Sequence, residues 1–251
     1  MVESFLQDAA SPAKAGARGV VVPHAGLQYS GSCAAHVFTG VEWPELIVII
    51  GPNHTGVVPV RGRASVWVRG GFDTPLGVVP MAEEFASALC DTCPDAVPDR
   101  TAHAYEHAIE VELPFLRVVQ PSARIVPIVV NTDAWESCQS VAEALANLIR
   151  AWPEPVVLMA SSDMSHFEDA PSAERKDRMA LEQITALNGE GLLATCRRHR
   201  ITMCGRAPTA VMVEAVRLLG AEQVDVVDYR NSGWLTGDTA NVVGYAGVVI
   251  R

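Results

Sequence analysis

The feature that most restricts the fold of this chain is a series of short, continuously apolar runs separated by segments with helical periodicity. The runs LIVIIG (46–51) and PVVLMA (155–160) contain no charged residue. Such runs are typical of strands that helices cover on both faces. The sequence predicts seven strands, over residues 19–22, 46–51, 64–69, 124–130, 155–161, 224–229 and 242–250.

Helical patterns occupy the segments between these strands. We expect helices over residues 31–39, 81–90, 104–119, 136–150, 173–187, 189–198 and 206–219. The alternation indicates an α/β fold with helices on both faces of a central, largely parallel or mixed sheet. A length of 251 residues suits one large domain or two small ones, and no Pro/Gly/Ser-rich linker divides the chain. We therefore predict a single domain over 1–251, with the Pro- and Gly-rich segment 70–80 as an ordered loop.

The charge balance argues against several classes of partner. The chain carries 29 acidic and 19 basic residues, a formal net charge of −10. It is therefore a poor partner for nucleic acid or for an anionic membrane surface. No apolar run reaches the length of a bilayer span, and the first residues lack the pattern of a secretion signal, so we expect a cytoplasmic protein. In that reducing compartment its six cysteines are expected to be buried, catalytic or metal-bound rather than cross-linked.

Polar side chains follow three of the predicted strands at the point where each strand ends. His24 follows the first strand, His54 follows the second, and Asp163 and His166 follow the run that ends near residue 161. The carboxyl ends of parallel strands line the ligand crevice of an open α/β sheet. One histidine in such a place is usually a hydrogen-bonded loop residue, but three coincident placements indicate a shared site.

Cys204 stands just before the helix that is predicted to begin at Arg206. A helix N-terminus stabilises anions and lowers the pKa of a thiol, so Cys204 is expected to be a nucleophile or a soft metal ligand. The alternative is a buried structural cysteine. His24, His54 and Cys204 together form a three-ligand set that suits iron, copper or zinc. Three protein ligands leave a position open for water, oxygen or substrate.

The segment HAYEHAIEVELPFL (103–116) adds further polar groups. His103 and His107 are four residues apart and would share one face of the predicted helix. Glu106, His107 and Glu110 fit two interpretations equally well. They form a solvated first turn, or His107 points into the crevice.

Other cysteines and histidines indicate no separate site. Cys33 and His36 are three residues apart in a predicted helix and are expected to pack against the sheet. Cys90 and Cys93 form a lone CxxC at the end of a helix, which argues against a four-cysteine zinc site and against a thioredoxin-type motif. The sequence contains neither a Gly-rich nucleotide loop nor a G-x-S-x-G elbow, so nucleotide binding and a serine-hydrolase triad are both unsupported.

Seven motifs, in order along nearly the whole chain, resemble those of the Memo family. They are PHAGLQYSGSCAAH, GPNHTG, DTPLG, EHAIEVELPFL, SSDMSH, CGRAPTAVMVEA and YRNSGWLTGDTANVVGYAGVVI. Bacterial and archaeal members of that family are labelled AmmeMemoRadiSam system protein B. The family in turn resembles class III extradiol ring-cleaving dioxygenases, which are non-haem iron enzymes.

The resemblance implies an α/β domain with a metal site at one edge of its sheet. It implies His24, His54 and Cys204 as ligands of a divalent transition metal, with iron(II) first and copper or zinc as alternatives. Asp163 and His166 would lie beside the metal, and His166 would act as the acid/base. The ring-cleaving enzymes use a carboxylate where this chain has Cys204, a replacement that alters metal preference and redox potential. Relatives occur with radical-SAM and AMMECR-type proteins, and some are described as binding tyrosine-phosphorylated peptides.

Three functions from different classes fit these residues. The first is an oxygenase-like oxidoreductase that depends on non-haem iron or copper, in which His166 moves a proton and Asp163 sets its tautomer or charge. The second is a non-catalytic module that binds a small-molecule or peptide ligand in the same crevice, with His107 and Arg206 as donors. The third is a hydrolase or amidase with Cys204 as the nucleophile.

Overall fold

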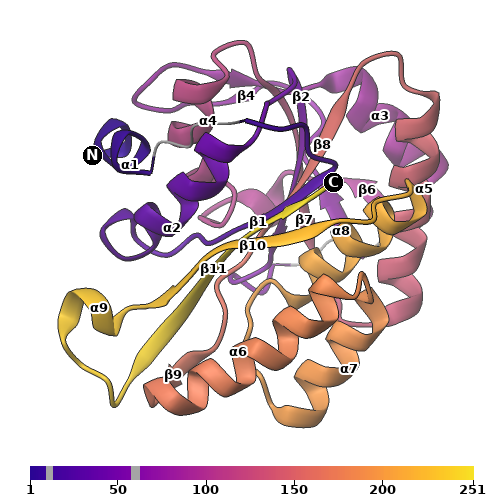
Figure 1. The fold of residues 1–251 in the computed structure, drawn as a ribbon. Coiled ribbons are helices and arrows are strands. Elements are labelled where there is room, and N and C mark those ends of the chain that lie inside the picture. Colours follow the sequence, from indigo (N-terminus) through magenta and orange to yellow (C-terminus); the bar gives the residue numbers. More distant parts are fainter. Residues whose placement is uncertain (10–13, 58–62) are drawn as a thin grey trace.

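A mixed β-sheet organises the computed structural model, which describes residues 1–9, 14–57 and 63–251 (Figure 1). The main path of the sheet runs β10-β11-β1-β8-β2-β7-β3-β6, and β9 pairs with β11. Its strands are β1 (Gly19–Val22), β2 (Leu46–Pro52), β3 (Ala64–Val66), β6 (Ala96–Pro98), β7 (Arg124–Val130), β8 (Val156–Ser161), β9 (His166–Glu168), β10 (Val224–Asn231) and β11 (Val242–Ile250).

The centre of the sheet consists of the parallel strands β1, β8, β2 and β7. In β2 every residue is buried, and successive side chains enter opposite faces. Val48 and Ile50 belong to one apolar core, whereas Ile47 and Ile49 belong to the other. Three antiparallel pairings extend this centre: β11 pairs with β1, β10 pairs with β11, and β3 pairs with β7. The prediction of an α/β fold with a largely parallel or mixed sheet is therefore confirmed, and the sheet is mixed.

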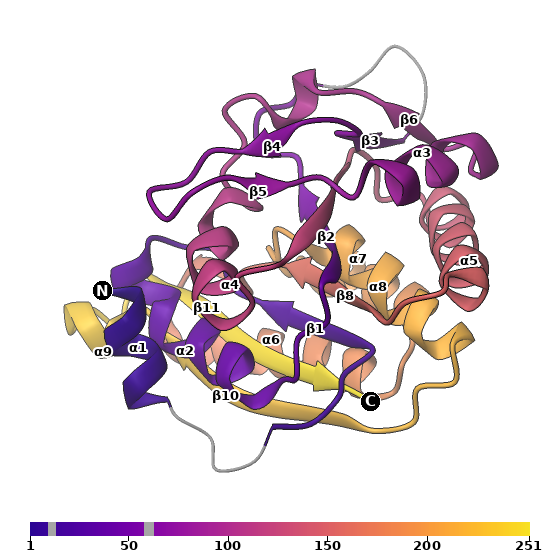
Figure 2. The ribbon, with the colours of Figure 1, turned by 90° about the horizontal axis from the view of Figure 1, so that it is seen from above.

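Two groups of helices cover the two faces of the sheet, and Figures 1 and 2 show α1 and α2 across β1 from α5 and α8. One group comprises α3 (Glu83–Thr92), α5 (Trp135–Ala151), α6 (Ala170–Thr185), α7 (Gly189–His199) and α8 (Arg206–Leu218). The other comprises α1 (Val2–Asp8), α2 (Leu27–Gly40) and α4 (Leu113–Val119). The short helix α9 (Gly233–Thr236) lies between β10 and β11. In the part of the chain that the structure describes, no helix has the length and apolar character that a membrane crossing requires.

The helix predicted over 104–119 is wrong in its first half. Thr101–His103 and Glu110–Glu112 are separate 3₁₀ turns, and α4 begins only at Leu113. Between the two turns Tyr105 adopts a φ of 65°, which an α-helix cannot contain. His103 and His107 therefore do not share a helical face.

Further differences concern short elements and the ends of elements, and β6, β9 and α9 were not predicted. The helix α1 was not predicted, and α2 begins at Leu27 rather than at residue 31. The segment 70–80, predicted as a loop, contains a small hairpin of β4 (Gly71–Phe72) and β5 (Val79–Pro80). None of these differences moves the polar residues that follow the central strands.

The strand order brings the predicted site residues to one edge of the sheet. Because β8 lies between β1 and β2 and all three run parallel, their carboxyl ends are neighbours. His24, Asp163 and His54 follow these three ends. Cys204 joins them at the start of α8, which packs against β8 and β2.

Candidate metal centre

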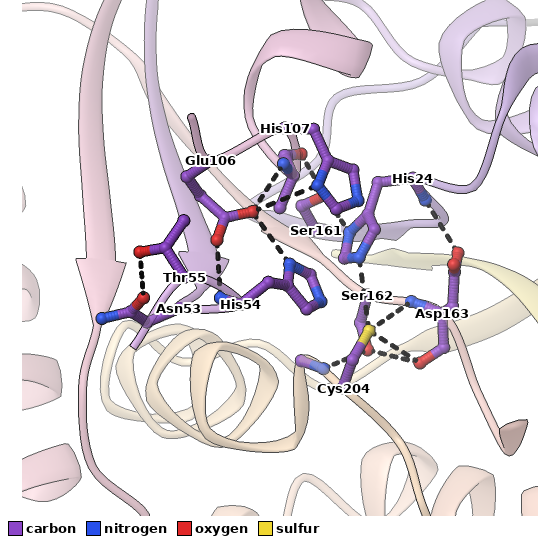
Figure 3. Close-up of polar contacts among 12 residues, drawn as sticks. His24, Asn53, His54, Thr55, Glu106, His107, Ser161, Ser162, Asp163 and Cys204 are labelled. Atoms are coloured by element: carbon purple, nitrogen blue, oxygen red, sulfur yellow. Dashed lines mark hydrogen bonds and ion pairs between the residues drawn. The ribbon is translucent and has the colours of Figure 1, made fainter. Parts of the chain in front are cut away.

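Three segments far apart in the chain bring two imidazoles and a thiol together. One ligand atom each of His24, His54 and Cys204 lies within 4.8 Å of the other two. Figure 3 shows the sulfur of Cys204 directed at the ring of His24, and the Sγ–Nε2 distance is 3.3 Å. Nitrogen and sulfur donors of this kind suit iron, copper or zinc rather than magnesium or calcium. The residues predicted as ligands are therefore close enough to share one ion.

His24 is buried and electrically neutral at physiological pH. Burial lowers the pKa of His24 to about 3, and the nearby imidazoles of His54 and His107 act in the same direction. Its Nδ1 lies 2.7 Å from Oγ of Ser161. A hydrogen bond from Nδ1–H to this hydroxyl leaves the Nε2 lone pair free on the side of Cys204, as a metal ligand requires.

His54 is held by a carboxylate that sequence analysis did not assign to the site. Glu106 accepts hydrogen bonds from the backbone N–H of His54 at 2.6 Å and from its Nδ1 at 2.8 Å. It also accepts from the N–H of Ala108. Burial opposes ionisation of Glu106, but these donors hold its pKa at about 2, and its carboxylate raises the pKa of His54. Of the two interpretations left open, the solvated turn is therefore wrong for Glu106, which is buried.

The turn around Tyr105 separates the two histidines of HAYEH. His107 stays with the centre, where its ring centroid lies 4.8 Å from that of His54 and 5.5 Å from that of His24. Its side chain is about half exposed, at 55%. His103 is buried elsewhere and donates from Nε2 to the carbonyl of Ser65. Burial lowers the pKa of His103 to about 4.

Cys204 does not have the lowered pKa that its place before α8 led us to expect. Burial raises the pKa of the Cys204 thiol to about 12, and the nearby Asp163 carboxyl raises it further. Hydrogen bonds from the backbone N–H groups of Asp163 and Gly205 and from the Ser162 side chain lower the pKa, but burial outweighs them. The metal-free thiol is therefore protonated near neutral pH, which removes the stated basis for a free cysteine nucleophile.

Gly205 explains how the sulfur comes so close to the end of β8. A Cβ atom at position 205 would collide with the side chain of Ser162 and lie 2.5 Å from the carbonyl oxygen of Ser161. The N–H of Gly205 donates to Oγ of Ser162. The absence of a side chain thus lets the start of α8 lie directly against the loop that follows β8.

Asp163 fixes the backbone at His24 and Ala25 by hydrogen bonds. One of its carboxyl oxygens accepts from the backbone N–H groups of His24 and Ala25, at 2.8 and 3.2 Å. Burial raises the pKa of Asp163 to about 6, although the neighbouring His166 partly opposes this. Asp163 and His166 form a second donor group with Cys204, again within 4.8 Å.

His166 obtains its orientation from a different partner than expected. Its Nδ1 donates to the carbonyl of Thr202 at 2.9 Å, and the hydroxyl of Thr202 accepts from its backbone N–H at 2.7 Å. The expectation that Asp163 sets the tautomer of His166 is therefore wrong, because a backbone carbonyl already does so.

Arg206 lies at the wall of a cavity of about 380 Å³ beside Cys204. Its guanidinium is engaged by Asp133, with Nε at 2.9 Å from the carboxylate and Nη2 on the same oxygen. Asn53 and Asn131 also line this cavity and are hydrogen-bonded to each other. The cavity is thus polar and adjoins the thiol.

The remaining cysteines and histidines lie outside the centre. Cys33 is buried between α2 and β10, as expected for packing, with its Sγ 4.0 Å from the carbonyl of Asp228. His36 is partly exposed and lies 3.7 Å from the Asp228 carboxylate. Cys90 and Cys93 are free thiols at the end of α3, and neither belongs to a donor group found among the described residues.

Comparison with known proteins gives consistent matches over nearly the whole chain. A family model described as Memo-like protein matches residues 1–249. A MEMO1 family protein of Methanopyrus kandleri is 40% identical over 237 residues, which cover 93% of this chain and 83% of the relative. One from Aquifex aeolicus is 39% identical over 234 residues, covering 92% and 85%.

A solved structure supports the fold alone. An uncharacterized protein of Escherichia coli K12 superposes with a TM-score of 0.59 at 13% identity. The match covers 92% of this chain and 98% of that protein. Such a low identity carries no information about chemistry.

Proposed function

The chain belongs to the Memo family, and from this premise we propose that it is a metal-dependent oxidoreductase whose ion is held by His24, His54 and Cys204. Iron(II) is the first choice of metal, with copper or zinc as alternatives. The observation that carries the proposal is the convergence of two imidazoles and one thiol within 4.8 Å from three separate segments.

The donor set fits a transition metal in its details. His24 is already neutral and presents Nε2 toward the sulfur. His54 is oriented by the Glu106 carboxylate, an arrangement that commonly fixes metal-bound histidines. A bound iron or copper ion would supply Lewis acidity and a change of oxidation state, which side chains alone do not provide.

The protein itself would position ligands and move protons. Asp163 anchors the backbone at His24, and His166 lies near both Asp163 and Cys204. An imidazole gains and loses protons readily near neutral pH, so we assign His166 the role of acid/base and Asp163 the role of a charged neighbour. A small molecule or a peptide segment would bind in the polar cavity beside Arg206 and contact the half-exposed ring of His107. Cooperation with radical-SAM and AMMECR-type proteins is part of the proposal.

Element analysis of protein made and kept without oxygen tests the ligand assignment. The wild type is expected to retain about one equivalent of a transition metal, and His24→Ala and Cys204→Ser are expected to lose it. His36→Ala and Cys90→Ser remove the same side-chain types outside the centre and should retain the metal. Retention by His24→Ala or Cys204→Ser would show that other residues hold the ion. Anaerobic handling matters because thiolates and ferrous ions oxidise in air.

A further inference from the structure

A third buried carboxyl group, Glu112, lies behind His24, and the roles assigned above do not use it. Its side chain has no solvent exposure. Oε1 lies 3.0 Å from Oγ of Ser161, and Oε2 has no hydrogen-bond partner among the described residues. A carboxylate buried in this way would leave one charged oxygen without a donor, at a high desolvation cost.

The hydrogen bonds around Ser161 can be assigned by counting protons. Its Oγ has three polar neighbours, namely Nδ1 of His24 at 2.7 Å, the carbonyl oxygen of Ala108 at 2.6 Å and Oε1 of Glu112 at 3.0 Å. A hydroxyl has one proton to donate and two lone pairs to accept with. The carbonyl of Ala108 can only accept, so the single proton of Ser161 belongs to that short contact.

The other two contacts must then donate to Ser161. Nδ1 of His24 donates as N–H, and Oε1 of Glu112 donates as the O–H of a neutral acid. If Glu112 were ionised, it would draw the Ser161 proton away from the carbonyl of Ala108. Two acceptor oxygens would then lie 2.6 Å apart with no proton between them.

We propose that Glu112 is a neutral carboxylic acid that positions His24, by donating to Ser161 and so fixing the hydroxyl that accepts from Nδ1–H of His24. The inference rests on the proposed function only in taking His24 as a metal ligand. The network leaves Nε2 of His24 as the unprotonated nitrogen, facing Cys204. Burial, which raises the pKa of Glu112 well above its ordinary value, supports the neutral form.

The two ligand histidines are thus backed by carboxyl groups of opposite character. Glu106 is ionised and contacts His54 directly, whereas Glu112 is neutral and reaches His24 through Ser161. Environments that drive the pKa values of two nearby carboxyls apart are characteristic of functional sites. Of these two carboxyl groups, only Glu106 therefore adds a negative charge behind a ligand histidine.

Two measurements on metal-free protein near neutral pH test the protonation states. Wild-type infrared spectra should contain the carbonyl stretch of a protonated carboxylic acid that disappears in Glu112→Gln and persists in the exposed control Glu110→Gln. Long-range ¹H–¹⁵N spectra, with His24 assigned by its loss in His24→Gln, should show the Nδ1–H tautomer. An unchanged infrared spectrum in Glu112→Gln, or an Nε2–H tautomer in the wild type, would overturn the proposal.

A conservative and a disruptive variant separate positioning from packing. Glu112→Gln retains an N–H that can donate to Ser161, so it should keep the His24 tautomer and bind Zn²⁺ within a few-fold of the wild type. Glu112→Leu fills similar space without a donor, and should mix the tautomers and weaken Zn²⁺ binding by about 10–100-fold. Equal behaviour of the two variants would contradict a positioning role. If the wild type bound no metal, the proposed function would fail, while the infrared and tautomer results would still decide the role of Glu112.

Discussion

At the residue scale, the geometry of the candidate centre depends on Glu106 and Ser161, which contact the rings of His54 and His24. His24, His54 and Cys204 were identifiable in the sequence because each stands at the end of a strand or the start of a helix. Glu106 was not, because its burial results from a contact with His54, 52 residues earlier in the chain. Ser161 was missed as a partner of His24 for the same reason, since the two are 137 residues apart. Sequence patterns report local periodicity, not long-range hydrogen bonds.

The contact between Glu106 and His54 leads to a prediction about metal affinity. Glu106→Gln removes the charge that raises the pKa of His54 and should weaken Zn²⁺ binding by about 10–100-fold. Competition with a chromophoric chelator measures this affinity. Glu110→Gln changes an exposed carboxylate in the same segment and should leave it unchanged. Equal affinities for the two variants would show that Glu106 has only a structural role.

The high pKa of the Cys204 thiol leads to a prediction about protons. Because the thiol is protonated near neutral pH and a metal binds the thiolate, Cys204 should release about one proton for each ion bound, in addition to any proton that His54 loses. Calorimetric titration with Zn²⁺ in buffers of different ionisation enthalpy measures the number released. Cys204→Ser should lose this release, and Cys90→Ser should keep it. No proton release by the wild type would mean that Cys204 is not a ligand.

At the scale of elements, the parallel strands β1, β8 and β2 were predictable from their apolar runs, but their order was not. The placement of β8 between β1 and β2 depends on side-chain packing across the whole sheet. The helix predicted over 104–119 begins too early, because the chain becomes α-helical only at Leu113. Before Leu113 the chain turns at Tyr105, and this turn places Glu106 and His107 beside His54.

The contact between α8 and the loop after β8 requires a glycine. Gly205→Ala would force its Cβ against Ser162 and the carbonyl oxygen of Ser161. We expect a loss of roughly 1–3 kcal/mol in the free energy of unfolding, as for other overpacked sites, together with weaker metal binding. Chemical denaturation measures the first effect. Gly40→Ala is the matched control, because a Cβ there meets no atom of the described residues within 4 Å, and equal stability of both variants would refute the close approach.

At the scale of the whole molecule, one apolar core lies on each face of the sheet, and buried ionisable groups lie at the edge formed by the carboxyl ends of the parallel strands. The α/β class and the position of the site at this edge followed from the alternation of apolar runs and helical patterns. The ionisation of the buried groups did not, because it depends on burial and on neighbours far along the chain. His24 and His103 are both buried in neutral form, with pKa values of about 3 and about 4.

Buried neutral histidines make stability depend on pH in a defined direction. Between pH 6.5 and about 4 the unfolded chain protonates His103 while the folded chain does not, so its contribution to the free energy of unfolding falls as the pH falls. His103→Gln should therefore take up as much as about one proton fewer on unfolding in this range. Asp163, with its pKa raised to about 6, acts in the opposite direction, so the variant must be compared with the wild type. Denaturation curves at several pH values give the slope of the free energy of unfolding against pH for the wild type, His103→Gln and the control His36→Gln. Identical slopes for the wild type and His103→Gln would contradict the prediction.

The central claim is that one ion is bound by two imidazoles and one thiolate from His24, His54 and Cys204. X-ray absorption spectroscopy of the metal-loaded protein, prepared without oxygen, tests it most directly because it identifies the atoms bound to the metal. We expect one sulfur ligand and two imidazole nitrogens in the wild type, with the sulfur lost in Cys204→Ser and kept in Cys90→Ser. A wild-type ion surrounded only by oxygen and nitrogen, or a sulfur that persists in Cys204→Ser, would show that Cys204 is not a ligand.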